Sequence, residues 1–159
     1  MNPSRIPTDF NFFPGNWQVS HRRLKQRLAN STDWEEFDGT CHVQTLLGGL
    51  GNVDDNVIDL PSAPYRAVTL RSFNPITHQW TIWWLDGRVP GRLDAPMVGA
   101  FKDGVGTFYG DDTLDDRPIK LRFLWTMAAP DVPRWEQAFS ADGGATWETN
   151  WVMTFTRAA

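Results

Sequence analysis

The chain has 159 residues, which is enough for one domain with a sizeable hydrophobic core. Its nine Trp, ten Phe, 11 Pro and 13 Gly are typical of an all-β chain with many turns. A net charge of −4 with scattered basic residues argues against a nucleic-acid-binding protein, and no run approaches the roughly 20 apolar residues of a membrane helix.

The N-terminus and the cysteine content indicate a compartment. The segment from Met1 to Pro7 lacks the apolar core of a signal peptide. Cys41 is the single cysteine, so no internal disulfide can form and a reducing environment fits. We therefore expect a cytoplasmic protein with no nucleic-acid or membrane partner.

Turn-forming residues divide the chain into short segments of alternating apolar and polar residues. Residues 1–13 are expected to form an N-terminal arm whose phenylalanines plug the fold, and residues 14–159 a single domain. No amphipathic helical stretch interrupts the pattern. Strands are expected at about 15–28, 34–47, 52–60, 65–73, 79–86, 97–102, 105–111, 118–126, 133–140 and 147–157.

An antiparallel sheet of about ten strands tends to curl and close, because closure removes its unpaired edges. We therefore predict an all-β, up-and-down β-barrel. Before the last strand, Ser140-x-Asp142-x-Gly144-x-Thr146-Trp147 has the pattern of an Asp box, a turn in which side chains bond backbone amides. One copy cannot build a sialidase propeller, so we interpret it as a hairpin turn that sets the register of the last strand.

Two features resemble the calycin pattern of lipocalins and fatty-acid-binding proteins. The first strand carries Gly15-x-Trp17, and Arg157 ends the last strand. In calycins a basic residue packs across the first-strand Trp ring, a cation–π contact that fixes the closure. The resemblance implies the same contact here.

The whole chain also resembles a family of short, uncharacterised lipocalin-like proteins, mostly bacterial. This resemblance implies a barrel with an internal cavity and brings no established activity. The matching segments are Trp34-Glu35-Glu36-Phe37, Gly48-Gly49-Leu50-Gly51-Asn52-Val53-Asp54, Leu70-Arg71-x-Phe73, Asn74-Pro75-x-Thr77-x-Gln79-Trp80, Gly104-Val105-Gly106-x-Phe108 and Trp135-Glu136-Gln137-Ala138-Phe139-Ser140.

Side chains alternate between the lumen and the outer face of a barrel, so lumen candidates are polar residues in register with inward aromatic residues. His21 and Arg23 share the face of Trp17; the alternative is that the strand leaves the barrel before them. Glu36 and His42 share the face of Trp34. The alternative places Phe37, Cys41 and Val43 inside and this polar face outside.

Further candidates come from the third to fifth strands. Asn52, Asp54 and Asn56 form a polar row, but the Gly and distal Glu of an EF-hand are missing, so we expect no metal. Around Trp80 to Trp84 both faces carry large side chains, so either can face the lumen. Asp86 and Arg88 are expected to form a charged pair at the mouth, or an ordinary loop-end salt bridge. The complete set of expected ligand contacts is His21, Arg23, Glu36, His42, Asn52, Arg71, Trp83, Asp86, Arg88, Tyr109, Arg122, Gln137 and Asn150.

The leading hypothesis is a barrel that binds a small apolar or aromatic ligand, with Arg71 or Arg122 receiving an anionic group. Arg71 could instead pair with Glu136 or Glu148. The alternative hypothesis is an isomerase, cyclase or hydrolase that uses lumen groups for acid–base catalysis. Its candidate groups are His21, Glu36, His42, Asp86 and Tyr109.

A third hypothesis is an interaction protein that forms a homodimer through surface tryptophans. No Ser-His-Asp arrangement or zinc-ligand spacing is recognisable. Neither His21 nor His42 lies in a haem motif. We therefore expect no cofactor.

Overall fold

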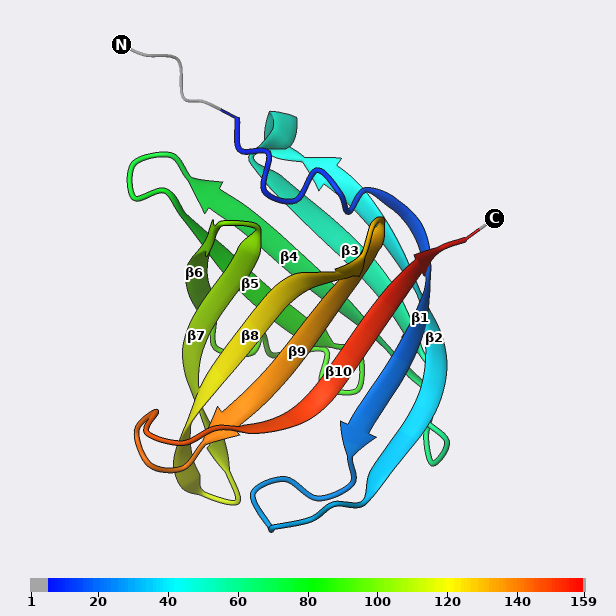
Figure 1. Cartoon of the computed structure of the whole chain (residues 1–159), viewed down its shortest axis with the longest axis vertical. Coiled ribbons are helices and arrows are strands. Elements are labelled where there is room, and N and C mark those ends of the chain that lie inside the picture. The colour runs from blue at the N-terminus through cyan, green and yellow to red at the C-terminus, as the bar shows by residue number, and fades with distance from the viewer. Residues whose placement is uncertain (1–5, 159) are drawn as a thin grey trace.

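The computed structural model describes residues 6–158, which form a closed antiparallel barrel (Figure 1). Each strand pairs with its neighbours in sequence, and β1 closes the ring by pairing with both β2 and β10. The predicted all-β, up-and-down barrel of about ten strands is confirmed. The strands are β1 (Gly15–Leu24), β2 (Trp34–Leu46), β3 (Gly51–Ile58), β4 (Tyr65–Asn74), β5 (Gln79–Asp86), β6 (Met97–Lys102), β7 (Val105–Leu114), β8 (Arg117–Ala129), β9 (Val132–Ser140) and β10 (Glu148–Arg157).

The strand boundaries follow the turn residues of the sequence closely. The main differences are that β1 ends at Leu24 rather than near residue 28, and that β7 and β8 extend to Leu114 and Ala129. A short 3₁₀ turn, η1 (Leu47–Gly49), separates β2 from β3, and its Gly48 adopts a φ of 63°. Within residues 6–158 no helix has the length and apolar character needed to cross a membrane.

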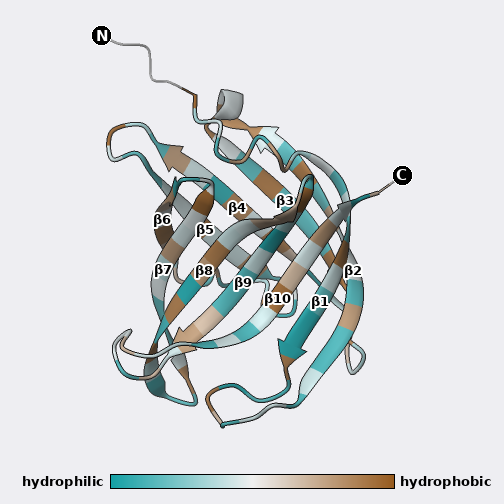
Figure 2. Ribbon diagram, viewed as in Figure 1, coloured by the Kyte–Doolittle hydropathy of each residue, from teal (hydrophilic) through white to brown (hydrophobic). Residues whose placement is uncertain are grey.

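The barrel has two different ends, or poles (Figure 1). At one pole lie the start of β1, the end of β10 and residues 6–13 of the predicted N-terminal arm, whose residues 1–5 lie outside the described residues. At the opposite pole lie the β1–β2, β3–β4, β5–β6 and β9–β10 connections. We call these the plugged pole and the mouth. Brown apolar and teal polar bands alternate along many strands in Figure 2, as expected where successive side chains point in and out.

Aromatic rings from residues 6–13 of the arm fill the plugged pole. Phe10 and Phe13 are buried, and Phe10 packs edge-on against Trp80 with ring centroids 4.9 Å apart. The arm is also fixed by hydrogen bonds: Trp17 Nε1 donates to the Phe13 carbonyl at 2.7 Å, and Trp80 Nε1 donates to Asp9 Oδ2 at 2.9 Å. Phe10 and Phe13 therefore belong to the core of the barrel.

The closure between β1 and β10 has the calycin-like contact. The Arg157 guanidinium lies 4.0 Å from the centre of the buried Trp17 ring. The same guanidinium donates to the carbonyls of Pro14 at 2.7 Å and Phe12 at 2.9 Å. One side chain therefore joins the last strand, the first strand and the arm.

Replacing Arg157 with methionine is expected to lower the free energy of unfolding by about 1–2 kcal/mol, after allowance for partial exposure of the guanidinium. Urea unfolding followed by Trp fluorescence measures the change. Arg134→Met is the control, because Arg134 only forms an ion pair with Glu136 on β9. That control is expected to change stability by less than about 1 kcal/mol. Equal losses in both variants would show that the closure contact contributes nothing specific.

The β9–β10 connection has the hydrogen bonds of the predicted turn. Ser140 Oγ accepts from the Gly144 amide at 2.9 Å, and Asp142 Oδ1 accepts from the Thr146 amide at 2.9 Å. Bonds from Thr146 and Ser140 hold the pKa of the Asp142 carboxyl down at about 2. Trp147 Nε1 closes the turn by donating to the Gly144 carbonyl at 3.1 Å.

Candidate functional site

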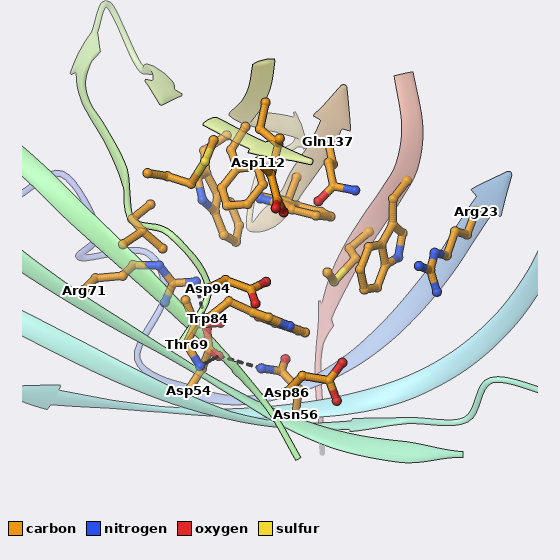
Figure 3. A pocket seen from close by; sticks show the side chains of 18 of the residues that line it. Arg23, Asp54, Asn56, Thr69, Arg71, Trp84, Asp86, Asp94, Asp112 and Gln137 are labelled. Atoms are coloured by element: carbon orange, nitrogen blue, oxygen red, sulfur yellow. Dashed lines mark hydrogen bonds and ion pairs between the residues drawn. The ribbon is translucent and has the colours of Figure 1, made fainter. Parts of the chain in front are cut away.

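A cavity of about 210 Å³ lies inside the barrel, in the region drawn in Figure 3. Its walls combine aromatic rings with two groups of charged residues. The rings and other apolar side chains come chiefly from β5, β8, β9 and β10. The polar groups come from β1, β3, β4, the end of β5, the β5–β6 connection, β7 and β9. The aromatic residues among its walls are Tyr65, Trp84, Phe123, Trp125, Trp135, Phe139, Trp151 and Phe155.

The end of the cavity nearest the plugged pole, called the inner end below, contains a buried ion pair. Arg71 Nη2 lies 2.8 Å from Asp54 Oδ2, and Arg71 Nη1 donates to Asn52 Oδ1 at 2.8 Å. Asp54 Oδ1 accepts further bonds from Asn56 Nδ2 at 2.6 Å and from the Thr69 amide at 3.1 Å. The Arg71 charge is therefore balanced by Asp54 on the adjacent strand, and not by Glu136 or Glu148, the two partners considered from the sequence.

Two hydrogen-bond donors beside this pair have no acceptor within residues 6–158. They are Arg71 Nε and Trp125 Nε1, and both residues line the cavity. The Arg71 guanidinium lies 5.5 Å from the Trp125 ring centre, so the two residues are neighbours. A buried donor without a partner costs about 1–3 kcal/mol, so this end of the cavity favours an oxygen acceptor from a ligand or water.

The mouth carries the predicted pair of Asp86 and Arg88. Arg88 Nη2 donates to Asp86 Oδ2 at 2.8 Å and Arg88 Nε donates to Asp86 Oδ1 at 3.1 Å. The hydrogen bonds to Arg88 lower the pKa of the Asp86 carboxyl. The Arg88 guanidinium lies 3.6 Å from the Tyr65 ring centre, so it covers one side of the mouth.

Arg23 is a third arginine on the cavity wall, at the mouth end of β1. Its guanidinium lies 4.8 Å from the Trp151 ring centre. Within residues 6–158 it makes no ion pair within 4.0 Å, and its Nε has no hydrogen-bond partner. Burial, and then the charge of Arg27, lower the pKa of Arg23, although an arginine remains charged at neutral pH.

Asp94 and Asp112 also line the cavity. Asp94 lies in the β5–β6 connection, where its amide donates to the Trp84 carbonyl at 3.0 Å. Burial, followed by the charge of Asp112, raises the pKa of Asp94. Within residues 6–158 neither aspartate forms an ion pair, so the cavity walls hold unpaired charges of both signs. In Figure 3, Asp94 and Asp112 lie apart from Arg23.

His21 is buried beside the cavity and does not line it. Its Nδ1 accepts a hydrogen bond from Trp151 Nε1 at 3.1 Å, and its ring stacks on Phe37 with centroids 4.7 Å apart. Burial, helped by the charge of Arg23, lowers the pKa of His21 to about 4. Its neutral ring is therefore part of the core. Gly39, which lies opposite Val19 on β2, leaves room beside the ring, because a Cβ there would clash with the Val57 carbonyl oxygen and lie 3.0 Å from His21 Nε2.

Two further candidates form a polar pair in β9 and β10. Gln137 lines the cavity and its Nε2 donates to Asn150 Oδ1 at 2.8 Å. Asn150 is fully buried behind it at an irregularity in the β9–β10 pairing, and Asn150 Nδ2 has no partner within residues 6–158. Asn52 is likewise buried behind the wall, where it supports Arg71.

The expected lumen positions of Glu36 and His42 are wrong. Phe37, Cys41 and Val43 are the buried residues of β2, so the opposite face points outward. His42 lies on the surface with its Nδ1 2.6 Å from Asn16 Oδ1. Of the two alternatives that the sequence left open for this strand, the one with Phe37, Cys41 and Val43 inside and the polar face outside is therefore correct.

Three more candidates lie outside the barrel. On β5, Trp80, Ile82 and Trp84 face inward, so Trp83 faces outward. On β7 and β8, Tyr109 and Arg122 lie opposite each other in register, and both alternate with inward residues such as Phe108 and Phe123. The Arg122 guanidinium covers the outer Trp147 ring at 4.7 Å, so it cannot receive a ligand in the lumen.

The acid–base constellation considered from the sequence is not assembled. Of its five candidate groups, only Asp86 lines the cavity, and Asp86 is bound to Arg88. Within the described part of the chain, no group of three His, Cys, Asp or Glu side chains is arranged to hold a metal ion. The five predicted contacts that do line the cavity are Arg23, Arg71, Asp86, Arg88 and Gln137.

Sequence reasoning missed several cavity residues. Trp84, Trp135 and Trp151 follow from strand alternation once one inward residue is known on each strand. Asp94 and Asp112 lie in or beside segments expected to be irregular, where alternation gives no direction.

No protein-family model matches this chain, and no curated protein matches its sequence significantly.

Proposed function

We propose that this protein binds a small, flat and largely apolar molecule inside the barrel. The observation that carries the proposal is the cavity of about 210 Å³ with aromatic walls. Such a volume suits a molecule of one or two fused rings. Trp84, Trp135 and Trp151 supply rigid surfaces against which a planar ring can stack.

The packing around the cavity supports a preformed binding site. Trp151 meets Trp135 edge-on at 5.4 Å and Trp84 edge-on at 6.2 Å, so each ring is held by another. The buried ion pair between Arg71 and Asp54 holds the neighbouring part of the cavity wall in place. A site whose walls are already ordered loses little conformational entropy when a ligand binds. The calycin-like closure is consistent with a binding protein of lipocalin type, as the sequence resemblance implies.

Calorimetric titration tests the proposal with a panel of medium-chain fatty acids, aromatic carboxylates and neutral two-ring aromatic compounds. We expect the two-ring compounds to bind with a stoichiometry of one ligand per protein chain. Absence of binding by every class would contradict the proposal. Tryptophan fluorescence supplies a second readout with the fatty acids, which do not absorb in the same range.

Replacing Leu121 with tryptophan is expected to weaken binding at least tenfold, because Leu121 lines the cavity and a larger side chain occupies the ligand volume. The matched control is Leu124→Trp, three residues along β8 on the opposite face. That control is expected to keep wild-type affinity. If Leu121→Trp is folded by circular dichroism and still binds like wild type, the cavity is not the binding site.

A further inference from the structure

Among residues 6–158, three arginines line the cavity, and only two of them have their own carboxylate. Arg71 is paired with Asp54 and Arg88 with Asp86, both at 2.8 Å. Arg23 has no such partner within residues 6–158. The arginine that is free to accept an anion is therefore neither Arg71 nor Arg122, the two expected from the sequence.

Glu35 is the carboxylate closest to Arg23 in register, directly opposite it on β2. No atoms of the two side chains come within ion-pair distance, and Glu35 has the smallest of the effects that act on the Arg23 charge. Arg27 and Arg88, two further neighbours, carry the same sign as Arg23. The Asp86 carboxylate also lies within reach of the Arg23 charge, but it is already bound to Arg88. Leaving a half-buried guanidinium in this state is unfavourable, and an anion from outside the chain would relieve it.

We infer that the ligand carries a carboxylate, or a similar single anionic group, that binds the guanidinium of Arg23. This inference rests on the proposed binding function and specifies the class of ligand. The planar guanidinium lies against the Trp151 ring, and its Nε–H has no partner within residues 6–158. Nε–H together with an Nη–H suits the two oxygens of a carboxylate.

The other polar groups that line the cavity would orient the ligand. Asp94 and Asp112 repel a carboxylate, and Asp54 neutralises Arg71 at the inner end. Arg71 Nε and Trp125 Nε1 can still donate to an uncharged oxygen there. An aromatic or other apolar acid would therefore lie with its rings among the tryptophans and its carboxylate at the mouth.

The test compares 2-naphthoate with 2-naphthamide, which have the same rings and nearly the same shape but differ in charge. Calorimetric titration at neutral pH is expected to give the carboxylate an affinity about 10- to 100-fold higher, the range for charge-assisted hydrogen bonds. Arg23→Gln is expected to remove this preference and to leave the affinity for the amide within about twofold.

Arg22→Gln is the matched control. Arg22 is the next residue on β1, but it faces outward, where its guanidinium lies 4.3 Å from the Trp34 ring centre. The control is expected to keep the full preference for the carboxylate. Arg23→Lys keeps the charge without the planar fork and is expected to keep only part of the preference.

Each outcome separates the two proposals. If the amide binds wild type and the carboxylate binds no better, or if the preference survives in Arg23→Gln, the inference about Arg23 is wrong and the binding function stands. If neither compound nor any other member of the panel binds, both fail. If Arg23 served only to neutralise Glu35, Arg23→Gln and Glu35→Gln would each lower the urea midpoint and leave the preference unchanged.

Discussion

Replacing Asp54 with asparagine is expected to lower the free energy of unfolding by about 3–5 kcal/mol. The substitution keeps the size of the side chain but removes the negative charge that balances Arg71. Both side chains are almost completely buried, at 3% and 5% exposure. The Arg71 charge would then remain in the core without a counterion, and the bonds from Asn56 and the Thr69 amide would lose their charged acceptor.

Urea unfolding followed by Trp fluorescence and by circular dichroism measures this effect. Asp55→Asn is the matched control: Asp55 is the next residue, faces outward and pairs with Arg66 in solvent. It is expected to cost less than about 1 kcal/mol. The double variant Asp54→Asn with Arg71→Met is expected to recover part of the loss, because it removes the unpaired charge. Equal costs for Asp54→Asn and Asp55→Asn would contradict the structural role of the buried pair.

His21 is expected to make the protein less stable in mild acid. The pKa of His21 is about 4 in the folded chain and close to 6.5 in an unfolded one. Between these values the unfolded chain binds more protons, so the free energy of unfolding falls as the pH falls from 6.5 towards 4. The expected loss from this one group is about 3 kcal/mol by pH 4, and it is absent above pH 7.

His21→Gln isolates this contribution, because other groups also titrate in acid. The variant can keep a hydrogen-bond acceptor near Trp151 Nε1 but has no proton to gain. We expect a lower stability at pH 7, together with a shallower decline between pH 6.5 and pH 4 than in wild type. His42→Gln, on the outer face of β2, is expected to keep the wild-type decline. If His21→Gln and wild type have parallel profiles, the imidazole is not the cause.

The barrel itself could be predicted because its turns are encoded locally. Asp103-Gly104 and Asn74-Pro75 mark the turns between strands, and positive φ values at Asp103 and Gly104 agree with a tight hairpin there. Closure was predicted from the number of strands and from the pairing of Trp17 with Arg157. The turn signals depend on residues next to each other in the chain, and the closure signal depends on one contact between two residues. Both kinds of signal can be recognised in a single sequence.

The direction of side chains was harder to predict wherever both faces of a strand carry large groups. Trp34 lies at the start of β2, where Arg22 covers it outside the barrel, and it therefore misled the choice of face. Trp83 and Trp84 are adjacent, so only the register with other strands decides which one points inward. The lumen position predicted for Arg122 was wrong, although Ile119, Leu121, Phe123 and Trp125 alternate with it along β8 and contain a signal for its outward direction.

The charge pairing of the lumen depends on contacts between strands that a single sequence does not reveal. Arg71 and Asp54 are neighbours only because β3 and β4 pair in one register, in which Asp54 lies opposite Thr69. The same applies to Arg23, because no single-sequence pattern shows that it has no ion-pair partner within residues 6–158. Asp94 reaches the cavity from a connection without regular structure.

Because aromatic rings fill the plugged pole, the proposed ligand would enter and leave the barrel through the mouth. Phe10 and Phe13 fill the plugged pole, while Arg23, Tyr65 and Arg88 line the cavity towards the mouth. A ligand bound as proposed would enter rings first and leave carboxylate first. Its release would begin with the loss of the contact to Arg23, so the residence time of the ligand, more than its rate of capture, would depend on that one side chain.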